Sequence, residues 1–129
     1  MKKSQKTDAR CIELMLKYIS HMEEAYNHYN ISSKNDLEEN VLCHLAITQL
    51  ITNVYECSKK LREKALDEMP LFSSMKRSLR TARNIASHEY EEVDFKVLHD
   101  AVTQLLRKKV TSELEGVQNA FKNSDHGNE

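Results

Sequence analysis

The feature that most constrains the fold of this 129-residue chain is its near absence of glycine and proline. It contains only two glycines, Gly116 and Gly127, and a single proline, Pro70. β-Sandwiches, β-barrels and βαβ folds need many tight turns, which these two residue types form most readily. Phosphate-binding loops, dinucleotide-binding loops and nucleophile elbows are also excluded, because no glycine precedes position 116. The composition therefore predicts an all-α fold.

The spacing of apolar residues predicts one helical bundle. These residues recur at three- and four-residue intervals, as in helices with one buried face. Four main helices with short connections are typical of an up-down bundle, expected over residues 1–122 and followed by a frayed polar tail over 123–129. We expect helices over Asp8–Tyr29, from a cap at Asn35 or Asp36 to about Leu66, from about Phe72 to Arg83, and from a cap at Asp94 to about Leu114.

Charge and cysteine content limit the partners and the cellular location that we expect for the protein. Nineteen basic and twenty acidic residues give a net charge of −1, so nucleic acid could bind only at a local patch. No apolar run approaches the ~20 residues that span a bilayer, and no signal peptide is recognisable, so we expect no membrane association. The three cysteines, Cys11, Cys43 and Cys57, are odd in number and far apart. They are expected to be small core residues of a cytoplasmic protein.

The second helix is expected to bury two different faces. At 100° per residue, Ile47, Leu50 and Val54 fall on one side, while Leu42, Leu45 and Ala46 fall on the other. The second face then becomes polar, continuing as Gln49, Asn53, Glu56 and Lys60. This polar stripe either marks the wet end of the bundle, with an i,i+4 ion pair between Glu56 and Lys60, or lines a functional cleft.

The third helix carries a basic track. Lys76, Arg80 and Arg83 lie within about 60° of one another on a helical wheel. Such a track can be an ordinary solvated surface. It is also what a phosphodiester backbone requires, since the planar guanidinium matches phosphate oxygens. Lys76 and Arg80 are therefore candidate RNA-binding residues.

Metal chemistry is not predicted. None of the six histidines has an acidic residue three positions before it, as di-iron bundles require. The chain also lacks Cys-x-x-Cys and His-Glu-x-x-His motifs. We therefore expect no metal site and no cofactor.

The densest cluster of reactive residues is Arg83-Asn84-Ile85-Ala86-Ser87-His88-Glu89-Tyr90. His88 could transfer protons near neutral pH, while Arg83 would stabilise negative charge on phosphoryl oxygens. In an unbroken helix the two side chains would point about 140° apart, so the helix should end or distort near Ala86 to Ser87. One histidine cannot be both base and acid in one step, which favours a homodimer with a shared cleft.

This cluster resembles the Arg-x4-His-x-Tyr motif of HepT-like ribonucleases, a branch of the HEPN superfamily. The resemblance covers about Asp8 to Val110, and Asn84 matches the polar residue that usually follows the motif arginine. Glu56 and Lys60 match the acidic-x3-basic pair found upstream of the motif in many HEPN proteins. A departure is the absence of a tryptophan after Pro70, where many relatives have one.

The resemblance implies a HEPN-type bundle of four to five helices, a homodimeric toxin of a toxin–antitoxin system that cleaves RNA without a metal. Arg83 and His88 would be catalytic, Asn84 would orient them, and Glu56 and Lys60 would support them. The implied partner is a minimal nucleotidyltransferase antitoxin, which would silence the toxin by transferring AMP to Tyr90. The alternative is a non-catalytic helical partner or substrate-binding subunit of a nucleotidyltransferase.

Overall fold

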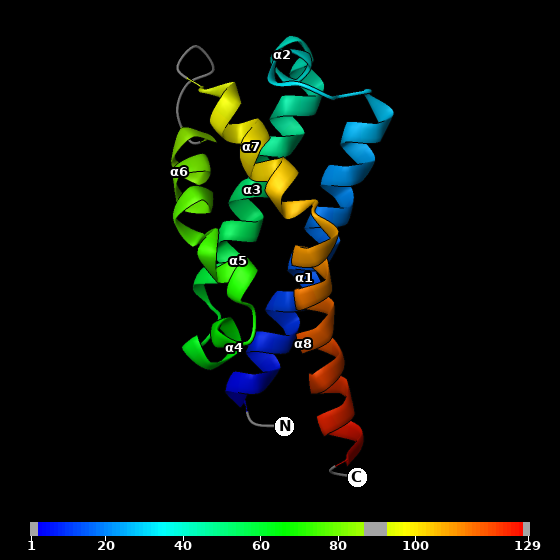
Figure 1. The fold of residues 1–129 in the computed structure, drawn as a ribbon, viewed down its shortest axis with the longest axis vertical. Coiled ribbons are helices and arrows are strands. Elements are labelled where there is room, and N and C mark those ends of the chain that lie inside the picture. The colour runs from blue at the N-terminus through cyan, green and yellow to red at the C-terminus, as the bar shows by residue number, and fades with distance from the viewer. Residues whose placement is uncertain (1–2, 87–92, 128–129) are drawn as a thin grey trace.

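The computed structural model describes residues 3–86 and 93–127, and this part of the chain forms eight α-helices and no strand (Figure 1). The predicted all-α class is therefore confirmed. The helices are α1 (Lys3–His28), α2 (Lys34–Glu39), α3 (Val41–Lys59), α4 (Glu63–Asp67), α5 (Pro70–Ser74), α6 (Lys76–Ala86), α7 (Phe95–Leu105) and α8 (Lys108–Gly127).

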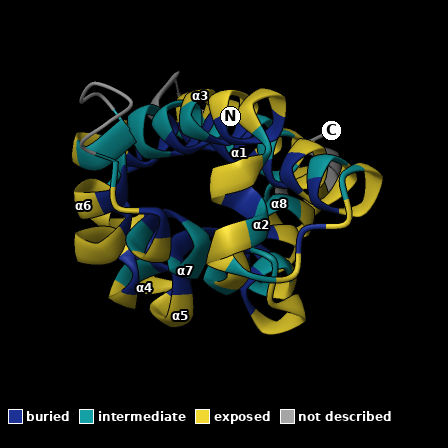
Figure 2. Ribbon diagram, turned by 90° about the horizontal axis from the view of Figure 1, so that it is seen from above, coloured by how far each residue is buried: buried dark blue, intermediate teal, exposed yellow. Residues whose placement is uncertain are grey.

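The packing of the helices determines the neighbours of α6. α3 packs against both α1 and α6, α8 runs beside α1, and α7 contacts α6 and α2. Seen from above, α3 lies at one side of the molecule and α5 and α7 lie at the opposite side, with α6 at the edge that joins them (Figure 2). One flank of α6 therefore adjoins α3 and the other adjoins α7.

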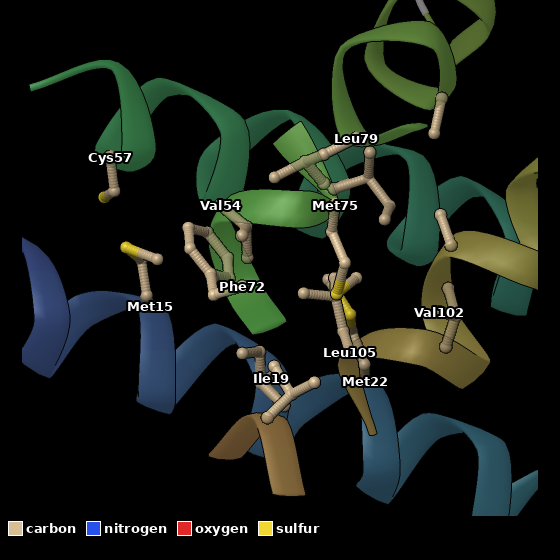
Figure 3. Close-up of a cluster of buried hydrophobic side chains, with 14 of the residues drawn as sticks. Met15, Ile19, Met22, Val54, Cys57, Phe72, Met75, Leu79, Val102 and Leu105 are labelled. Carbon is tan, nitrogen blue, oxygen red and sulfur yellow. The ribbon is translucent and has the colours of Figure 1, made fainter. Parts of the chain in front are cut away.

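The core is built from the apolar faces of these helices. Met15, Ile19 and Met22 of α1 meet Phe72 of α5 and Leu105 of α7 in one continuous cluster (Figure 3). All three cysteines are free and buried, and burial raises the pKa of each thiol. They are small core residues, as expected.

The expected second helix is divided into α2, α3 and α4. The cap of α2 is Ser33, whose Oγ accepts from the backbone N–H of Asp36, so the predicted cap at Asn35 or Asp36 is wrong. Asn40 interrupts the helix and starts α3, because its Oδ1 accepts from the backbone N–H of Cys43 at 2.9 Å. α3 then ends at Lys59, earlier than the expected limit near Leu66.

The expected third and fourth helices are also interrupted. Helix α5 begins at Pro70, and the Glu113 carboxylate of α8 accepts from the backbone N–H groups of Leu71 and Phe72, each at 2.9 Å. The chain turns at Met75 before α6 begins. Of the contacts at these two places, only the pair of bonds from Glu113 is non-local; the turn at Met75 is closed by its own backbone N–H, which donates to the carbonyl oxygen of Phe72.

The C-terminal region begins at the predicted cap but forms two helices where one was expected. Asp94 caps α7, accepting from the backbone N–H groups of Lys96 and Val97. A break after Leu105 separates α7 from α8, which continues through Gly127 into the segment expected to be frayed. None of the helices in the described ranges is long and apolar enough to cross a membrane.

A buried ion pair joins α1 to the connection between α3 and α4. The Asp8 side chain is almost fully buried, and its Oδ2 lies 2.6 Å from Nε of Arg62. Its Oδ1 accepts from the backbone N–H of Arg62 at 3.1 Å. Both carboxylate oxygens are thus satisfied, as a buried charge requires.

Candidate functional site

Arg83 lies on the last turn of α6 and faces α3. Its Nη2 is 3.4 Å from Oε1 of Glu56, and its Nη1 donates to Oδ1 of Asn84 at 3.3 Å. The guanidinium carbon stands 5.6 Å from the centre of the Tyr55 ring, within the range of a cation–π contact. The side chain of Arg83 remains 36% exposed. Three groups therefore orient a guanidinium that solvent, or a ligand, can still reach.

Glu56 connects the two helices of the site by pairing with two cations. Its Oε1 faces Arg83, and its Oε2 lies 3.8 Å from Nζ of Lys59. The expected ion pair with Lys60 is not formed, since Lys60 is the C-cap of α3 and lines a hollow beside Cys11. The structure thus brings Glu56, Arg83 and Asn84 together and places Lys60 elsewhere.

Tyr55 is a site residue that the sequence reasoning missed. Its ring is contacted by Arg83 and also by Lys59, whose Nζ lies 5.5 Å from the ring centre. The i,i+4 spacing of Tyr55 and Lys59 is visible in the sequence. The contact with Arg83 is not, because it depends on how α6 packs against α3.

The basic track lies on the exposed side of α6. Lys76 and Arg80 are both solvent-exposed, and within the described ranges neither forms an ion pair. Arg77 shares this exposure, although it was not singled out from the sequence.

The remaining motif residues cannot be placed. His88 and Tyr90 lie within residues 87–92, outside the described residues. The described part of α6 ends at Ala86, directly before this segment.

The outward face of α3 is apolar and exposed. Val41, Leu42 and Leu45 are 49%, 69% and 54% exposed, so the expectation that Leu42 and Leu45 are buried is wrong. The helical positions that follow on this face carry Gln49, Asn53 and Glu56. The face therefore runs from an uncovered apolar patch to the carboxylate that holds Arg83.

Two histidines of the described chain, His44 and His99, form hydrogen bonds between helices and lie outside this site. Nδ1 of His44 lies 3.0 Å from the carbonyl oxygen of Leu37, and Nδ1 of His99 lies 2.9 Å from the hydroxyl of Tyr26. Among the residues that the structure describes, no group of three or more histidine, cysteine or acidic side chains could hold a metal ion.

Comparison with known proteins found no family model, no curated protein and no solved structure that matches this chain.

Proposed function

We propose that this chain is a metal-independent endoribonuclease that acts as a homodimer. The observation that carries the proposal is the held but accessible guanidinium of Arg83, five residues before His88. An arginine has five N–H donors, and the contacts with Glu56 and Asn84 leave others for phosphoryl oxygens. This arrangement suits recognition of a phosphodiester.

The proposed reaction is transfer of the RNA phosphoryl group to the neighbouring 2′-hydroxyl. The 2′-oxygen loses its proton and bonds to phosphorus, while the bond to the 5′-oxygen breaks and that oxygen gains a proton. Two groups must handle these protons, and His88 from each of two subunits would supply them. Arg83 would stabilise the charge that develops on the phosphoryl oxygens.

The exposed face of α3 supports the homodimer. An apolar patch made of Val41, Leu42 and Leu45 is unusual on a surface in contact with water alone. A second copy on this patch would extend along the same face towards Glu56 and Arg83. The dimer would bring two arginines together, and the two Glu56 carboxylates would offset their repulsion.

The resemblance to HepT-like ribonucleases extends the proposal to a cytoplasmic HEPN-type toxin, controlled by a minimal nucleotidyltransferase antitoxin. AMP transferred to Tyr90, two residues after His88, would add a negative phosphodiester group beside the motif. That group would occupy Arg83 and exclude RNA. Lys76 and Arg80 would hold RNA next to the site, whereas Lys60 lies beside Cys11 and takes no part in the proposal.

The proposal is tested by incubating the purified chain with a fluorescent RNA in the presence of a metal chelator. We expect cleavage to products that end in a cyclic or linear phosphate, and loss of cleavage in His88→Ala. The matched control is His21→Ala, which removes an exposed histidine of α1 and should cleave normally. Absence of cleavage by the wild-type chain, or unchanged cleavage by His88→Ala, would favour the non-catalytic subunit instead.

A further inference from the structure

A second set of cations lies on the flank of α6 that adjoins α7, away from α3. Two surface hollows of about 320 and 370 Å³ share Gln104 as a common wall. Joined at Gln104, they form a groove lined by α5, α6, α7 and the start of α8. Helices α5 and α7 lie on the side of the molecule opposite α3 (Figure 2). We name this surface the basic groove and define it by Ser74, Arg77, Thr81, Gln104, Arg107 and Lys109.

The charge of the basic groove is unbalanced. Within the described ranges, Arg77, Arg107 and Lys109 form no ion pair. The one carboxylate in the lining, Asp100, already pairs with Nζ of Lys96 at 3.0 Å. The chain as a whole carries a net charge of −1, so this positive charge is a local feature. Like charges gathered in this way attract an anion from outside.

Helix stability does not explain these cations. Arg107 precedes α8, Lys108 and Lys109 occupy its first turn, and no acidic residue lies in that turn. The helix dipole is positive at this end, so cations here weaken the helix. Their side chains are exposed. An anionic ligand would offset this unfavourable charge, whereas no acidic residue in the first turn of α8 does so.

Arginine side chains connect the basic groove to the candidate site. Arg77, Arg80 and Arg83 follow one another at three-residue spacing on α6. Each is turned by about 60° from the last, so together they pass around the outer surface of the helix. Arg83 at one end faces Glu56 on α3, and Arg77 at the other end lines the groove beside α7. These three arginines therefore connect the candidate site to the basic groove.

The chemistry of the lining favours a phosphodiester backbone over a protein. The amide of Gln104 can donate to phosphate oxygens beside the cations, while the hydroxyls of Ser74 and Thr81 already donate to backbone carbonyl oxygens. Apolar side chains complete the lining, among them Leu71 and Val97. The lining has no aromatic side chain on which a base could stack or around which a protein interface could form its centre. Binding would thus be tolerant of sequence.

We propose that the basic groove binds the backbone of the substrate RNA, and that Arg80 bridges it to Arg83. This inference rests on the proposed ribonuclease function and adds an RNA path beyond the site. Substrates long enough to reach the groove gain affinity from it, whereas a dinucleotide at Arg83 does not.

Binding is measured by fluorescence anisotropy with a 2′-O-methyl RNA of twelve nucleotides, which cannot be cleaved at the 2′-oxygen. The double variant Arg77→Gln, Lys109→Gln should bind about tenfold more weakly at low salt. Its salt dependence should fall by about 1.4 in logarithmic slope, since each lost phosphate contact on a single strand removes about 0.7. The matched control is Arg10→Gln, Lys17→Gln, which removes the same charges from the exposed side of α1 and should bind as the wild type does.

Equal binding by the groove variant and the wild type would overturn the inference, provided that both unfold at the same temperature. A polyglutamate of the same length that binds as tightly as the RNA, and weakens equally in the variant, would also overturn it, in favour of an acidic protein partner. Cleavage of a dinucleotide separates the two proposals. The groove variant should cleave it normally. A wild-type chain that cleaves neither the dinucleotide nor the fluorescent RNA contradicts the ribonuclease function and leaves the binding result to stand by itself.

Discussion

The two surfaces that border α6 differ in the kind of molecule that could cover them. On the α3 side, Leu42 and Leu45 expose apolar surface that gains free energy only by leaving water. On the α7 side, Arg77 and Lys109 expose positive charge without an ion-pair partner in the described ranges. Arg83 lies between these surfaces. The two proposals accordingly place a second protein chain on the α3 side of the site and RNA on the α7 side.

The largest effect is expected where the two surfaces meet. Arg83→Ala should lower the rate of RNA cleavage by about 10²- to 10³-fold, because the charge on the phosphoryl oxygens loses its stabilising partner. The comparison is made by single-turnover cleavage of the fluorescent RNA.

Arg10→Ala provides the control, since it removes an exposed arginine from α1. An Arg83→Ala variant that cleaves at the rate of this control would show that the guanidinium takes no part in the reaction.

A variant that lowers stability without touching either surface separates loss of folding from loss of cleavage. Asp8→Ala leaves Arg62 without its buried partner and should lower the free energy of unfolding by about 3 kcal/mol. Urea denaturation followed by circular dichroism gives this value.

If the Asp8→Ala protein is kept folded at low temperature, its cleavage rate should remain close to that of the wild type. An unchanged unfolding midpoint would mean that the Asp8–Arg62 pair contributes nothing net to stability.

The apolar surface is tested by placing charge on it. Leu42→Glu or Leu45→Glu should weaken the homodimer by at least about 30-fold, because a buried interface position would then hold an unpaired carboxylate. Sedimentation velocity over a range of protein concentrations measures the change.

Both leucines are exposed in the single chain, so these variants should unfold at the wild-type temperature. Leu71→Glu is the matched control, since it alters an exposed leucine on α5, away from α3. If Leu71→Glu dissociated the dimer and the α3 variants did not, the dimer interface would not be on α3.

The smallest effect concerns Tyr55, whose ring supports Arg83. Tyr55→Leu should lower kcat/KM by about 2- to 5-fold, the value of an exposed cation–π contact. Tyr55→Phe keeps the ring and should retain the wild-type rate. A loss of activity in Tyr55→Phe would instead assign the role to the hydroxyl.

Composition was enough to predict the helical class, and periodicity placed Glu56 and Arg83 on two helices that the structure shows to pack together. It could not predict where helices break. Asn40 reads as an ordinary polar residue, yet its bond to the backbone of Cys43 starts a new helix. The first turn of α5 carries Pro70, a local signal, but it is also held by Glu113, more than forty residues later in the chain. The Glu113 contact becomes visible only when the fold is known.

The same limit applies to the site. The sequence predicted that Leu42 and Leu45 are buried, whereas the structure shows both exposed, because spacing alone cannot tell whether another helix of the chain covers a given face. It also predicted an ion pair between Glu56 and Lys60, whereas Lys60 is the C-cap of α3 and Lys59 is the partner. Spacings of three and four residues both place a lysine beside Glu56 on a helix, so the sequence could not choose between them.

The central claim is a metal-independent ribonuclease site completed by two subunits. It is tested most directly by measuring the cleavage rate per chain, in the presence of a chelator, across the concentration range in which the dimer dissociates. The account predicts that the rate per chain falls in step with the fraction of dimer. A rate per chain that is the same in monomer and dimer, or no cleavage at any concentration, would contradict it.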